Sequence, residues 1–249
     1  MTDVLLSATN ITRRFRGLTA IDQVSLSLAR GTVHAVIGTN GAGKSTLVSV
    51  LAGELAPNEG SIFLHRQEVT SWPQPRRARA GLGRSYQRTT IFPTLTVHEN
   101  CRIAAQANHQ AFWNWATPAS KCKASNEAAD HAISLAGLES DSTQIAGLLS
   151  HGRKRQLEIA MSLATRPSVL LLDEPLAGMG SEETDRMLGL LASLKAEHAI
   201  LLIEHDMDAV FRVADEITVM VNGRVIAHGE PQAIRDNPEV QTAYLGDGE

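Results

Sequence analysis

Apolar residues alternate with polar ones or run together in short segments through the first third of the chain, a pattern typical of β-strands. The predicted strands lie at residues 4–15, 22–30, 32–38, 60–69 (as a hairpin) and 82–86. Between them, Leu47, Val50 and Leu51 recur at the spacing of one helix face and predict a helix over residues 44–54. Strands linked through a helix in this way indicate a fold of mixed α and β elements.

The middle of the chain, residues 88–166, has few strand patterns and is predicted to be helical. A stripe of apolar residues at helical spacing predicts the last of its helices at residues 152–165. After Pro167 the alternation returns, with strands predicted at 169–173, 199–204, 217–221 and 224–228 and helices at 181–197, 206–214 and, more weakly, 231–245. The pattern therefore predicts an α/β core into which a helical segment is inserted.

The composition fits a soluble globular protein and narrows its class. Hydrophobic residues make up 43% and aromatic residues only 4%, so the core must consist mainly of Leu, Val, Ile and Ala. The net charge of −4 argues against a protein that coats nucleic acid, and Cys101 and Cys122 show neither metal-ligand nor disulfide spacing. No apolar run approaches the ~18 residues of a membrane span, and the N-terminal segment lacks the pattern of a signal peptide. If the protein serves a membrane, we expect it to dock from the aqueous side.

The segment GTNGAGKST at residues 38–46 predicts a phosphate-binding loop, because it matches G-x-x-x-x-G-K-[ST] between a predicted strand and a predicted helix. Its glycines let the backbone N–H groups face a polyphosphate, and the helix that follows adds its positive end. Lys44 would meet the β- and γ-phosphates, and the Ser45 hydroxyl would ligate Mg²⁺. The expected nucleotide-binding residues are Gly38, Asn40, Gly41, Ala42, Gly43, Lys44, Ser45 and Thr46. A glycine-rich turn without function is the weaker interpretation.

Acidic and histidine side chains follow two of the later predicted strands. VLLLDE ends in Asp173 and Glu174 at the carboxyl end of an apolar strand, where ligands bind in open α/β sheets. We expect Asp173 to hold Mg²⁺ through water and Glu174 to polarise the attacking water; an exposed strand end is the alternative. His205 in LLIEHD would reach the same edge, where an imidazole can bond the γ-phosphate or the attacking water, although a lone histidine there is more often structural.

These motifs, with four others, resemble the nucleotide-binding subunit of ABC transporters over almost the whole chain. The other motifs are Phe15 as the adenine-stacking aromatic, SYQ (85–87) as the Q-loop, LSHG (149–152) as the signature motif and EHD (204–206) as the switch-histidine loop. The resemblance implies a P-loop NTPase core of the ABC ATPase type, with an N-terminal antiparallel β subdomain and an inserted α-helical subdomain. It implies one ABC ATPase domain over 1–249, with an α/β core at 1–87 and 167–230, a helical subdomain at 88–166 and a C-terminal helical tail at 231–249.

The same resemblance implies a head-to-tail dimer with two ATP molecules between the copies. Ser150 and the amides of Gly152 and Arg153 would bind the γ-phosphate of the nucleotide held by the other copy, while Lys154 and Arg155 would be solvated or braced against acids. Gln87 would act in catalysis by sensing both Mg²⁺ and the attacking water, and would join the core to the helical subdomain that touches a membrane partner. A dimer of two different ATPase subunits stays open.

LSHGRKRQLEIAMSLATRP, DEPLAGM and NPEVQTAYLG are similar to the ATPases of branched-chain amino acid, amide or urea importers. This implies integral-membrane permease partners, indirect work with a solute-binding protein, no nucleic acid, and a peripheral place at the cytoplasmic face of the inner (plasma) membrane. The alternative within the family is the ATPase of lipopolysaccharide export. A soluble ABC ATPase of DNA repair or chromosome structure is less favoured, since the chain has no heptads or paired cysteines, and a non-catalytic ATP sensor would not need the complete set of catalytic residues.

Three features depart from the family pattern or carry charge without an assigned role. His151 and Arg153 replace the glycine and glutamine of the commonest signature motif, and Gly180 stands where the aspartate of the family's D-loop is usual. The segment PQPRRARAG at 73–81 concentrates three arginines with only Trp72 nearby. A solvated helix surface is the better interpretation of this segment, because a nucleic-acid patch would interleave basic and aromatic residues.

Overall fold

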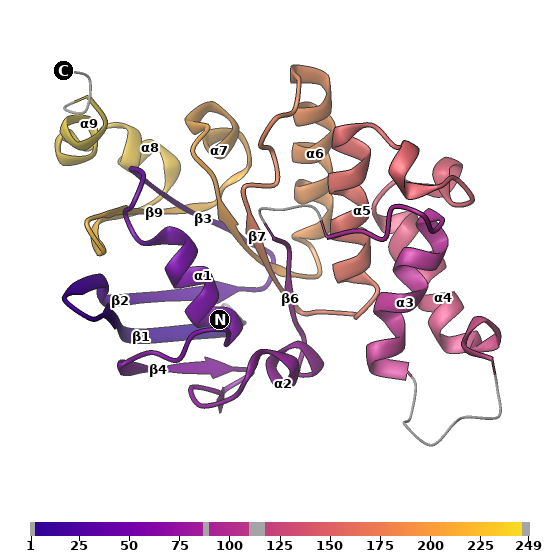
Figure 1. Ribbon diagram of the computed structural model, residues 1–249. Helices are drawn as coiled ribbons and strands as arrows, with labels where there is room; N and C mark the ends of the chain where they lie inside the picture. Colours follow the sequence, from indigo (N-terminus) through magenta and orange to yellow (C-terminus); the bar gives the residue numbers. More distant parts are fainter. Residues whose placement is uncertain (1–2, 87–89, 110–117, 246–249) are drawn as a thin grey trace.

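Six strands form the sheet on which the candidate site is built (Figure 1). The structure, a computed structural model, describes residues 3–86, 90–109 and 118–245. In spatial order the strands are β10 (Arg224–Gly229), β9 (Glu216–Val221), β3 (Val33–Gly38), β8 (Ala199–Ile203), β7 (Val169–Asp173) and β6 (Leu82–Arg84). All neighbours are parallel except β10 and β9. β3, β7 and β8 are buried along their whole length, as expected for parallel strands covered on both faces.

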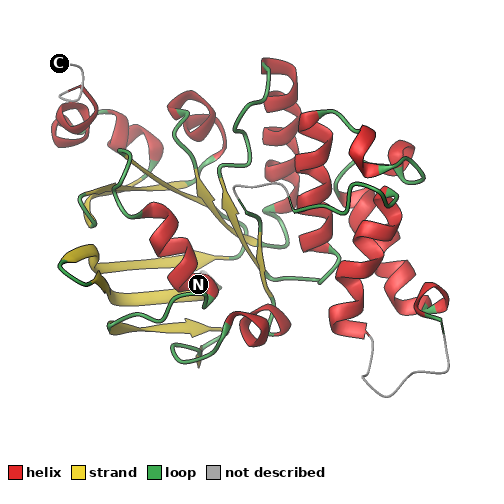
Figure 2. Ribbon diagram, viewed as in Figure 1, coloured by secondary structure: helices red, strands yellow, loops and turns green. Residues whose placement is uncertain are grey.

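A second, antiparallel sheet packs over one face of the first, with helix α1 (Lys44–Ala52) between them (Figure 2). Its strands are β2 (Leu18–Ala29), β1 (Val4–Phe15), β4 (Glu59–Leu64) and β5 (Gln67–Glu68). One core joins Leu28 of this sheet, Leu47 of α1 and Leu201 of the parallel sheet. Because side chains alternate along a strand, the other face of the parallel sheet is left for a second core.

That second core extends from the sheet into a group of helices placed between β6 and β7 in the chain. These are α3 (Val97–His109), α4 (Lys123–Leu135) and α5 (His151–Leu163), with one-turn 3₁₀ helices at Ala119–Lys121, Glu139–Asp141 and Ala146–Leu148. Small buried residues such as Ala105, Ala132 and Ala160 let these helices approach closely. α6 (Ser181–Leu194) lies beside α5, so the helices and the sheet share one apolar interior (Figure 1).

The predicted fold class is confirmed, with one error at the C-terminus. The antiparallel sheet, the parallel core and the inserted helices all occur, and most predicted elements differ from the observed ones only at their ends. The predicted helix at 231–245 is instead two helices, α8 (Pro231–Arg235) and α9 (Pro238–Leu245). They separate at Asn237, whose side-chain oxygen accepts from the amide of Glu239 at 2.9 Å and starts the second helix.

The arginine-rich segment forms α2 (Gln74–Arg79), and the expectation of a solvated surface is wrong for its central arginine. Arg77 is fully buried, and burial lowers its pKa to about 10. Its guanidinium donates to four main-chain carbonyls, those of Trp72 (3.1 Å), Val50 (2.9 Å), Leu51 (2.7 Å) and Thr70 (2.9 Å). Two of these carbonyls belong to the last turn of α1, where the helix dipole favours a cation. Arg77 therefore anchors the helix that follows the phosphate loop.

We predict that Arg77→Met lowers the free energy of unfolding by about 3–5 kcal/mol, because it leaves several buried carbonyls without donors. Arg76→Met is the matched control: Arg76 is exposed, with its guanidinium 3.7 Å from the centre of the Trp72 ring, and its loss should cost less than about 1 kcal/mol. Urea unfolding monitored by circular dichroism measures both. Equal costs for the two variants would contradict the anchoring role of Arg77.

Candidate active site

The loop between β3 and α1 is shaped by two glycines that admit no side chain. A Cβ on Gly38 would lie 2.1 Å from the carbonyl oxygen of Met220, and one on Gly43 would lie 2.3 Å from that of Ala20. Gly43 also has a φ of +97°, in the left-handed region that favours glycine. The loop is thereby pressed between β9 and the start of β2, which fixes its path across the carboxyl edge of the parallel sheet.

The N-terminus of α1 is open toward a ligand. Gly43 is its N-cap and offers no side-chain bond, and the first turn carries no acidic residue. A helix start leaves N–H groups without partners in the helix, and its dipole favours an anion. Ser45 is exposed at this end and Thr46 is half-buried. The N–H groups at this helix end are therefore available to bind an anion.

Lys44 is folded back onto its own loop. Its ammonium is buried and donates to the carbonyl oxygens of Gly38 at 2.6 Å and Thr39 at 3.0 Å. Burial lowers the pKa of Lys44, and the nearby carboxylates of Glu174 and Asp173 oppose that shift. The two carbonyls thus act as partners of the buried cation, a role that a polyphosphate could take instead.

An open cleft of about 500 Å³ lies in front of this loop and of the start of β2. The Arg13 guanidinium stacks 4.6 Å from the centre of the Phe15 ring. Phe15 is 36% exposed and lines the cleft. Leu18, 66% exposed, adds an apolar wall. Of the predicted nucleotide-binding and catalytic residues, the structure brings together in this lining Phe15, Asn40, Gly41, Ala42, Gly43, Lys44, Ser45, Thr46 and Glu174.

Asp173 ends β7 with a buried carboxylate oxygen that lacks a partner. Its amide donates to Ser85 Oγ at 3.2 Å, but Oδ1 has no hydrogen-bond donor in the described structure. Burial raises the pKa of Asp173, against the opposing effects of Arg84 and Lys44. A buried, unpaired carboxylate oxygen is costly in itself and is a preferred ligand of Mg²⁺. The described residues contain no group of three or more His, Cys, Asp or Glu suited to a metal.

Glu174 follows in a strained backbone conformation. Its φ is +49°, uncommon for a residue with a side chain, and its amide donates to the carbonyl oxygen of Ile203 at 2.9 Å. Such a conformation costs on the order of 1–3 kcal/mol, and Glu174 is one of eight described non-glycine residues with a positive φ. Here it turns the half-buried Glu174 side chain into the cleft.

A buried carboxylate one strand away ties two loops together. Glu204 is 1% exposed; its carboxylate accepts from the amide of Leu176 at 2.8 Å and from that of His205 at 3.3 Å. Burial raises the pKa of Glu204, while these two amides oppose the shift. The loops after β7 and β8, which carry Glu174 and His205, are thus joined by one side chain. His205 itself is 63% exposed and is not among the described residues that line the cleft.

The second group of predicted residues lies at the start of α5, apart from that lining. Ser150 is the N-cap of α5, and its Oγ accepts from the amide of Arg153 at 3.3 Å. The Arg153 side chain is committed elsewhere, donating to the carbonyl oxygen of Gly137 at 2.8 Å. His151, the departure from the family's glycine, donates through Nε2 to the carbonyl oxygen of Ala177 at 3.0 Å. The signature segment therefore contacts the loop that follows Glu174.

The body of α5 holds both flanks of the loop that carries Gln87, a residue that lies outside the described part of the chain. Arg155 is buried, not solvated, and donates to the carbonyl oxygen of Tyr86 at 3.0 Å and to Glu158 at 2.9 Å. Glu158 accepts from the amide of Thr90 at 2.6 Å, and its burial raises its pKa against that bond and the Arg155 charge. This ion pair fixes the two ends of the loop to the signature helix.

Comparison with known proteins identifies the class of the cassette. The ABC transporter family model matches residues 21–177, and a model of the branched-chain amino acid ATP-binding cassette transporters matches residues 224–249. The chain belongs to the ABC transporter family. The chain is 38% identical to the branched-chain amino acid transport ATP-binding proteins BraF of Pseudomonas aeruginosa and LivG of Escherichia coli, over 99% of this chain and 100% of theirs. The ATP-binding cassette MJ1267 in its ADP conformation superposes with a TM-score of 0.89 at 30% identity, covering 98% of this chain and 100% of that one.

A nucleotide-free cassette of an ABC transporter is also similar, with a TM-score of 0.87 at 29% identity over 97% of this chain and 98% of that one. The predicted enzyme class, an ATPase of the ABC family, is confirmed by these relationships. Lipopolysaccharide export, the alternative within the family, is not favoured by them.

Several residues of this ABC cassette that organise the site were missed by the sequence interpretation. Glu204 could have been suspected, because a carboxylate directly after a buried strand needs a partner. Arg155 was expected to be solvated or braced against acids, and its ion pair with Glu158 confirms the second; their i, i+3 spacing gives no sign of the loop contacts that they share. Glu183, whose carboxylate accepts from Ser150, gave no signal, since the two residues lie 33 positions apart.

We predict that Lys44→Ala weakens ATP binding by at least about tenfold, because the phosphates lose their buried cation. Isothermal titration calorimetry with ATP measures the change. Lys123→Ala removes a lysine whose side chain is 88% exposed and should leave the affinity unchanged. Equal affinities for wild-type and Lys44→Ala protein, with both folded by circular dichroism, would show that the loop does not hold the phosphates.

Proposed function

We propose that the chain powers solute import, as the ATP-hydrolysing subunit of a branched-chain amino acid, amide or urea type ABC importer. ATP hydrolysis by this chain is supported by one observation: the open N-terminus of α1, Lys44 and Glu174 lie together in one cleft at the carboxyl edge of the sheet. The importer type is supported by the C-terminal family match and by the full-length similarity to BraF and LivG.

ATP would enter with its adenine against the Phe15 ring and its phosphates on the loop. The N–H groups at the start of α1 would bind phosphate oxygens in place of water. Lys44 would leave the carbonyls of Gly38 and Thr39 and turn to the β- and γ-phosphates, a move of one flexible side chain toward a stronger anionic partner. This exchange avoids an unpaired buried cation at either stage.

The residues present fit Mg²⁺. Asp173 offers its unpartnered buried oxygen directly or through water, Ser45 offers an exposed hydroxyl at the helix start, and Gln87 is the third proposed contact. When bound, the cation would neutralise charge that develops on the phosphates. Burial raises the pKa of Asp173, and a bound cation would lower it.

For hydrolysis, Glu174 would act as the general base that polarises the attacking water. Its strained backbone and its place in the cleft lining support this role. His205 would bond the γ-phosphate or the water, and Glu204 would keep its loop at a fixed distance from the loop of Glu174. Gln87 would complete the contacts to the water.

The contacts to the γ-phosphate would be completed by a second ATPase subunit, through its Ser150 and the amides of its Gly152 and Arg153. Supporting this arrangement, the start of α5 is not part of the cleft lining within one chain, yet it offers a second helix N-terminus with a serine cap. Two positive helix ends on either side of one phosphate would be brought together by ATP and released by its hydrolysis. The second subunit is either a further copy of this chain or a related ATPase.

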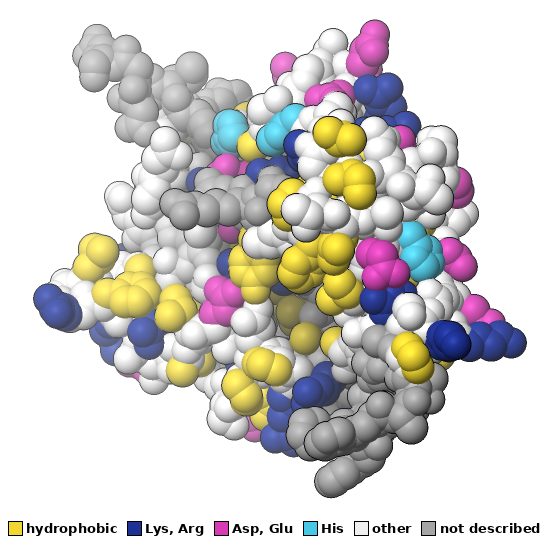
Figure 3. Space-filling view, turned by 45° about the vertical axis from the view of Figure 1, so that its right-hand side comes forward, with side chains coloured by type: hydrophobic (Ala, Val, Ile, Leu, Met, Phe, Trp, Pro, Cys, Tyr) yellow, Lys and Arg dark blue, Asp and Glu magenta, His cyan; other side chains and the backbone are white. Residues whose placement is uncertain are grey.

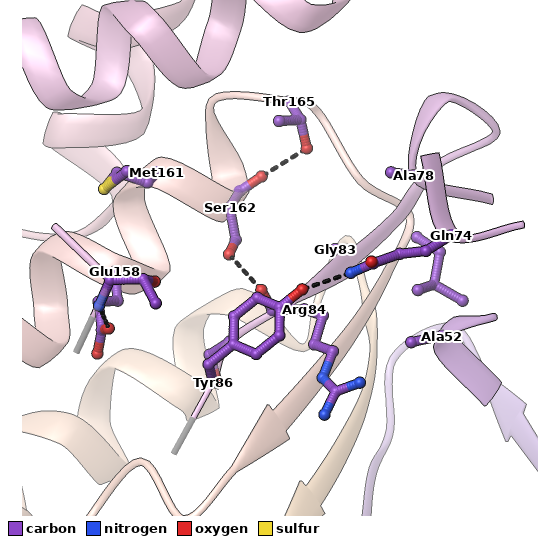
Figure 4. Close-up of a pocket in the computed structure, with 13 residues that line it drawn as sticks. Ala52, Gln74, Ala78, Gly83, Arg84, Tyr86, Glu158, Met161, Ser162 and Thr165 are labelled. Carbon is purple, nitrogen blue, oxygen red and sulfur yellow. Dashed lines mark hydrogen bonds between the residues drawn. The ribbon is translucent and has the colours of Figure 1, made fainter. Parts of the chain in front are cut away.

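The permease would contact the groove between the core and the inserted helices. This groove is lined from α2, β6 and α5, with the half-buried Met161 in its wall and Gln74 bonded to the Tyr86 hydroxyl (Figure 4). Phe92, Ile145 and Leu148 are large hydrophobic residues exposed on the inserted segment, 46%, 39% and 74% respectively. The space-filling view shows hydrophobic side chains gathered about a hollow on this side of the molecule (Figure 3). Such a surface suits an apolar helical segment of a membrane protein.

The proposed partners fit a division of the chain into a core, a permease-contacting subdomain and a tail, and a location at the membrane surface. The core would comprise residues 1–87 and 167–230, the permease-contacting subdomain residues 88–166, and the helical tail residues 231–249. The subunit would lie peripherally at the cytoplasmic face of the inner membrane, and a solute-binding protein would act on it only through the permeases. Among the described residues, no helix has the length and apolar character needed to cross a bilayer.

We predict that Glu174→Gln lowers the rate of ATP hydrolysis by about 10²–10⁴-fold while ATP affinity stays within about twofold, because the amide keeps the shape but cannot accept the proton. Single-turnover hydrolysis and an ATP titration measure the two quantities separately. Hydrolysis at the wild-type rate in Glu174→Gln would remove Glu174 from the role of general base.

We further predict that Ala78→Arg blocks assembly with the permeases, because it fills the groove with a charged side chain. Copurification of the tagged subunit with permeases encoded beside it measures assembly, and leucine uptake in reconstituted vesicles measures transport. Ala192→Arg, on an exposed position of α6 outside the groove, is the matched control and should assemble normally. Normal assembly of Ala78→Arg would place the permease contact elsewhere.

A further inference from the structure

A carboxylate of the same chain covers the first turn of α5. Glu183, in the first turn of α6, places Oε1 3.1 Å from Ser150 Oγ and 3.3 Å from the amide nitrogen of Gly152. A Cβ on Gly152 would lie 2.7 Å from Cδ of Glu183. The carboxylate therefore lies directly against the backbone, at a distance that only glycine permits.

The two donors that Glu183 occupies are the ones that the proposed function assigns to the γ-phosphate. A hydroxyl and an amide each have one hydrogen to give, so they cannot satisfy the carboxylate and the phosphate together. The two anions would also repel each other at this distance. Closure on ATP therefore requires Glu183 to leave its present position.

The surrounding charges explain why a carboxylate rests there. The first turn of α5 has no acidic residue of its own, so its positive end is met from α6. Glu182 and Glu183 both stand in the first turn of α6, but Glu182 is exposed to solvent while Glu183 is half-buried against α5. His151, at the start of α5, also contacts Ala177 in the loop between Glu174 and α6. The position of Glu183 is therefore connected to the position of that loop.

We propose that Glu183 is a positioning residue of the signature motif, a stand-in anion that keeps Ser150 and the Gly152 amide oriented for phosphate until the γ-phosphate on the second subunit displaces it. This inference rests on the proposed function, because it requires the signature motif to receive phosphate across a dimer. Displacement costs two hydrogen bonds to a charged group, so Glu183 raises the ATP concentration at which the dimer closes. It also couples closure to movement of the segment between Glu174 and α6.

The test measures ATP-driven association of the Glu174→Gln chain, alone and mixed with the second ATPase subunit with which it copurifies, by size-exclusion chromatography with light scattering. Adding Glu183→Gln or Glu183→Ala is expected to lower the ATP concentration for half-maximal association by about tenfold. Glu182→Gln removes the same charge from the same helical turn and is expected to change that concentration by less than about twofold.

A gain in association cannot arise from damage to the fold, which separates this role from a structural one. If both Glu183 variants need as much ATP as Glu182→Gln, or more, the inference is wrong while the proposed function stands. If the Glu174→Gln chain binds ATP but never associates in either mixture, the proposed function fails and the inference falls with it.

Discussion

The bond of the Lys44 ammonium to the carbonyls of Gly38 and Thr39 sets the resting form of the site. A buried charge without a partner is too costly to keep, so a loop built to bind phosphate must satisfy its own lysine until phosphate arrives. Gly43, with a φ of +97°, and Gly38, which lies against β9, shape the loop whose carbonyls accept from the side chain. The loop therefore gives its lysine two main-chain partners, which a phosphate could replace.

The same constraint acts at each other part of the proposed site, with different solutions. Glu183 accepts from the amide of Gly152 at the positive end of α5, and Glu204 accepts from two loop amides. The paired Arg155 and Glu158 bond the backbone on either side of Gln87, at Tyr86 and Thr90. Asp173 is the exception among the described catalytic groups, because one of its oxygens stays unpartnered, which is the feature expected of a residue awaiting a cation. Each of these contacts joins two segments that are distant in the sequence and to which the proposed function gives nucleotide or subunit contacts. Nucleotide binding would thus change contacts that also position the subunit surfaces.

The fold and the phosphate loop could be predicted because their signals are local. Strand and helix periods, the glycine spacing of residues 38–46 and the acids at the end of β7 are all contained within short stretches. The buried Arg77 and the Glu183 contact could not be predicted, because their partners come from distant segments and a charged residue usually signals solvent. From the sequence, His151 is only a departure from the family pattern, whereas the structure gives it a partner in Ala177. The break between α8 and α9 was within reach, since asparagine followed by proline marks a helix start.

In the proposed function one chain holds half of an active site, which ATP completes with a second ATPase subunit. The most direct measurement is a structure of the Glu174→Gln protein with ATP and Mg²⁺, assembled with its permeases and the second ATPase subunit. We expect the γ-phosphate to lie between the phosphate loop of one subunit and the signature motif of the other, with Lys44 turned to the phosphates and Glu183 withdrawn from Ser150. A nucleotide bound wholly within one subunit, with Ser150 still paired to Glu183, would contradict it.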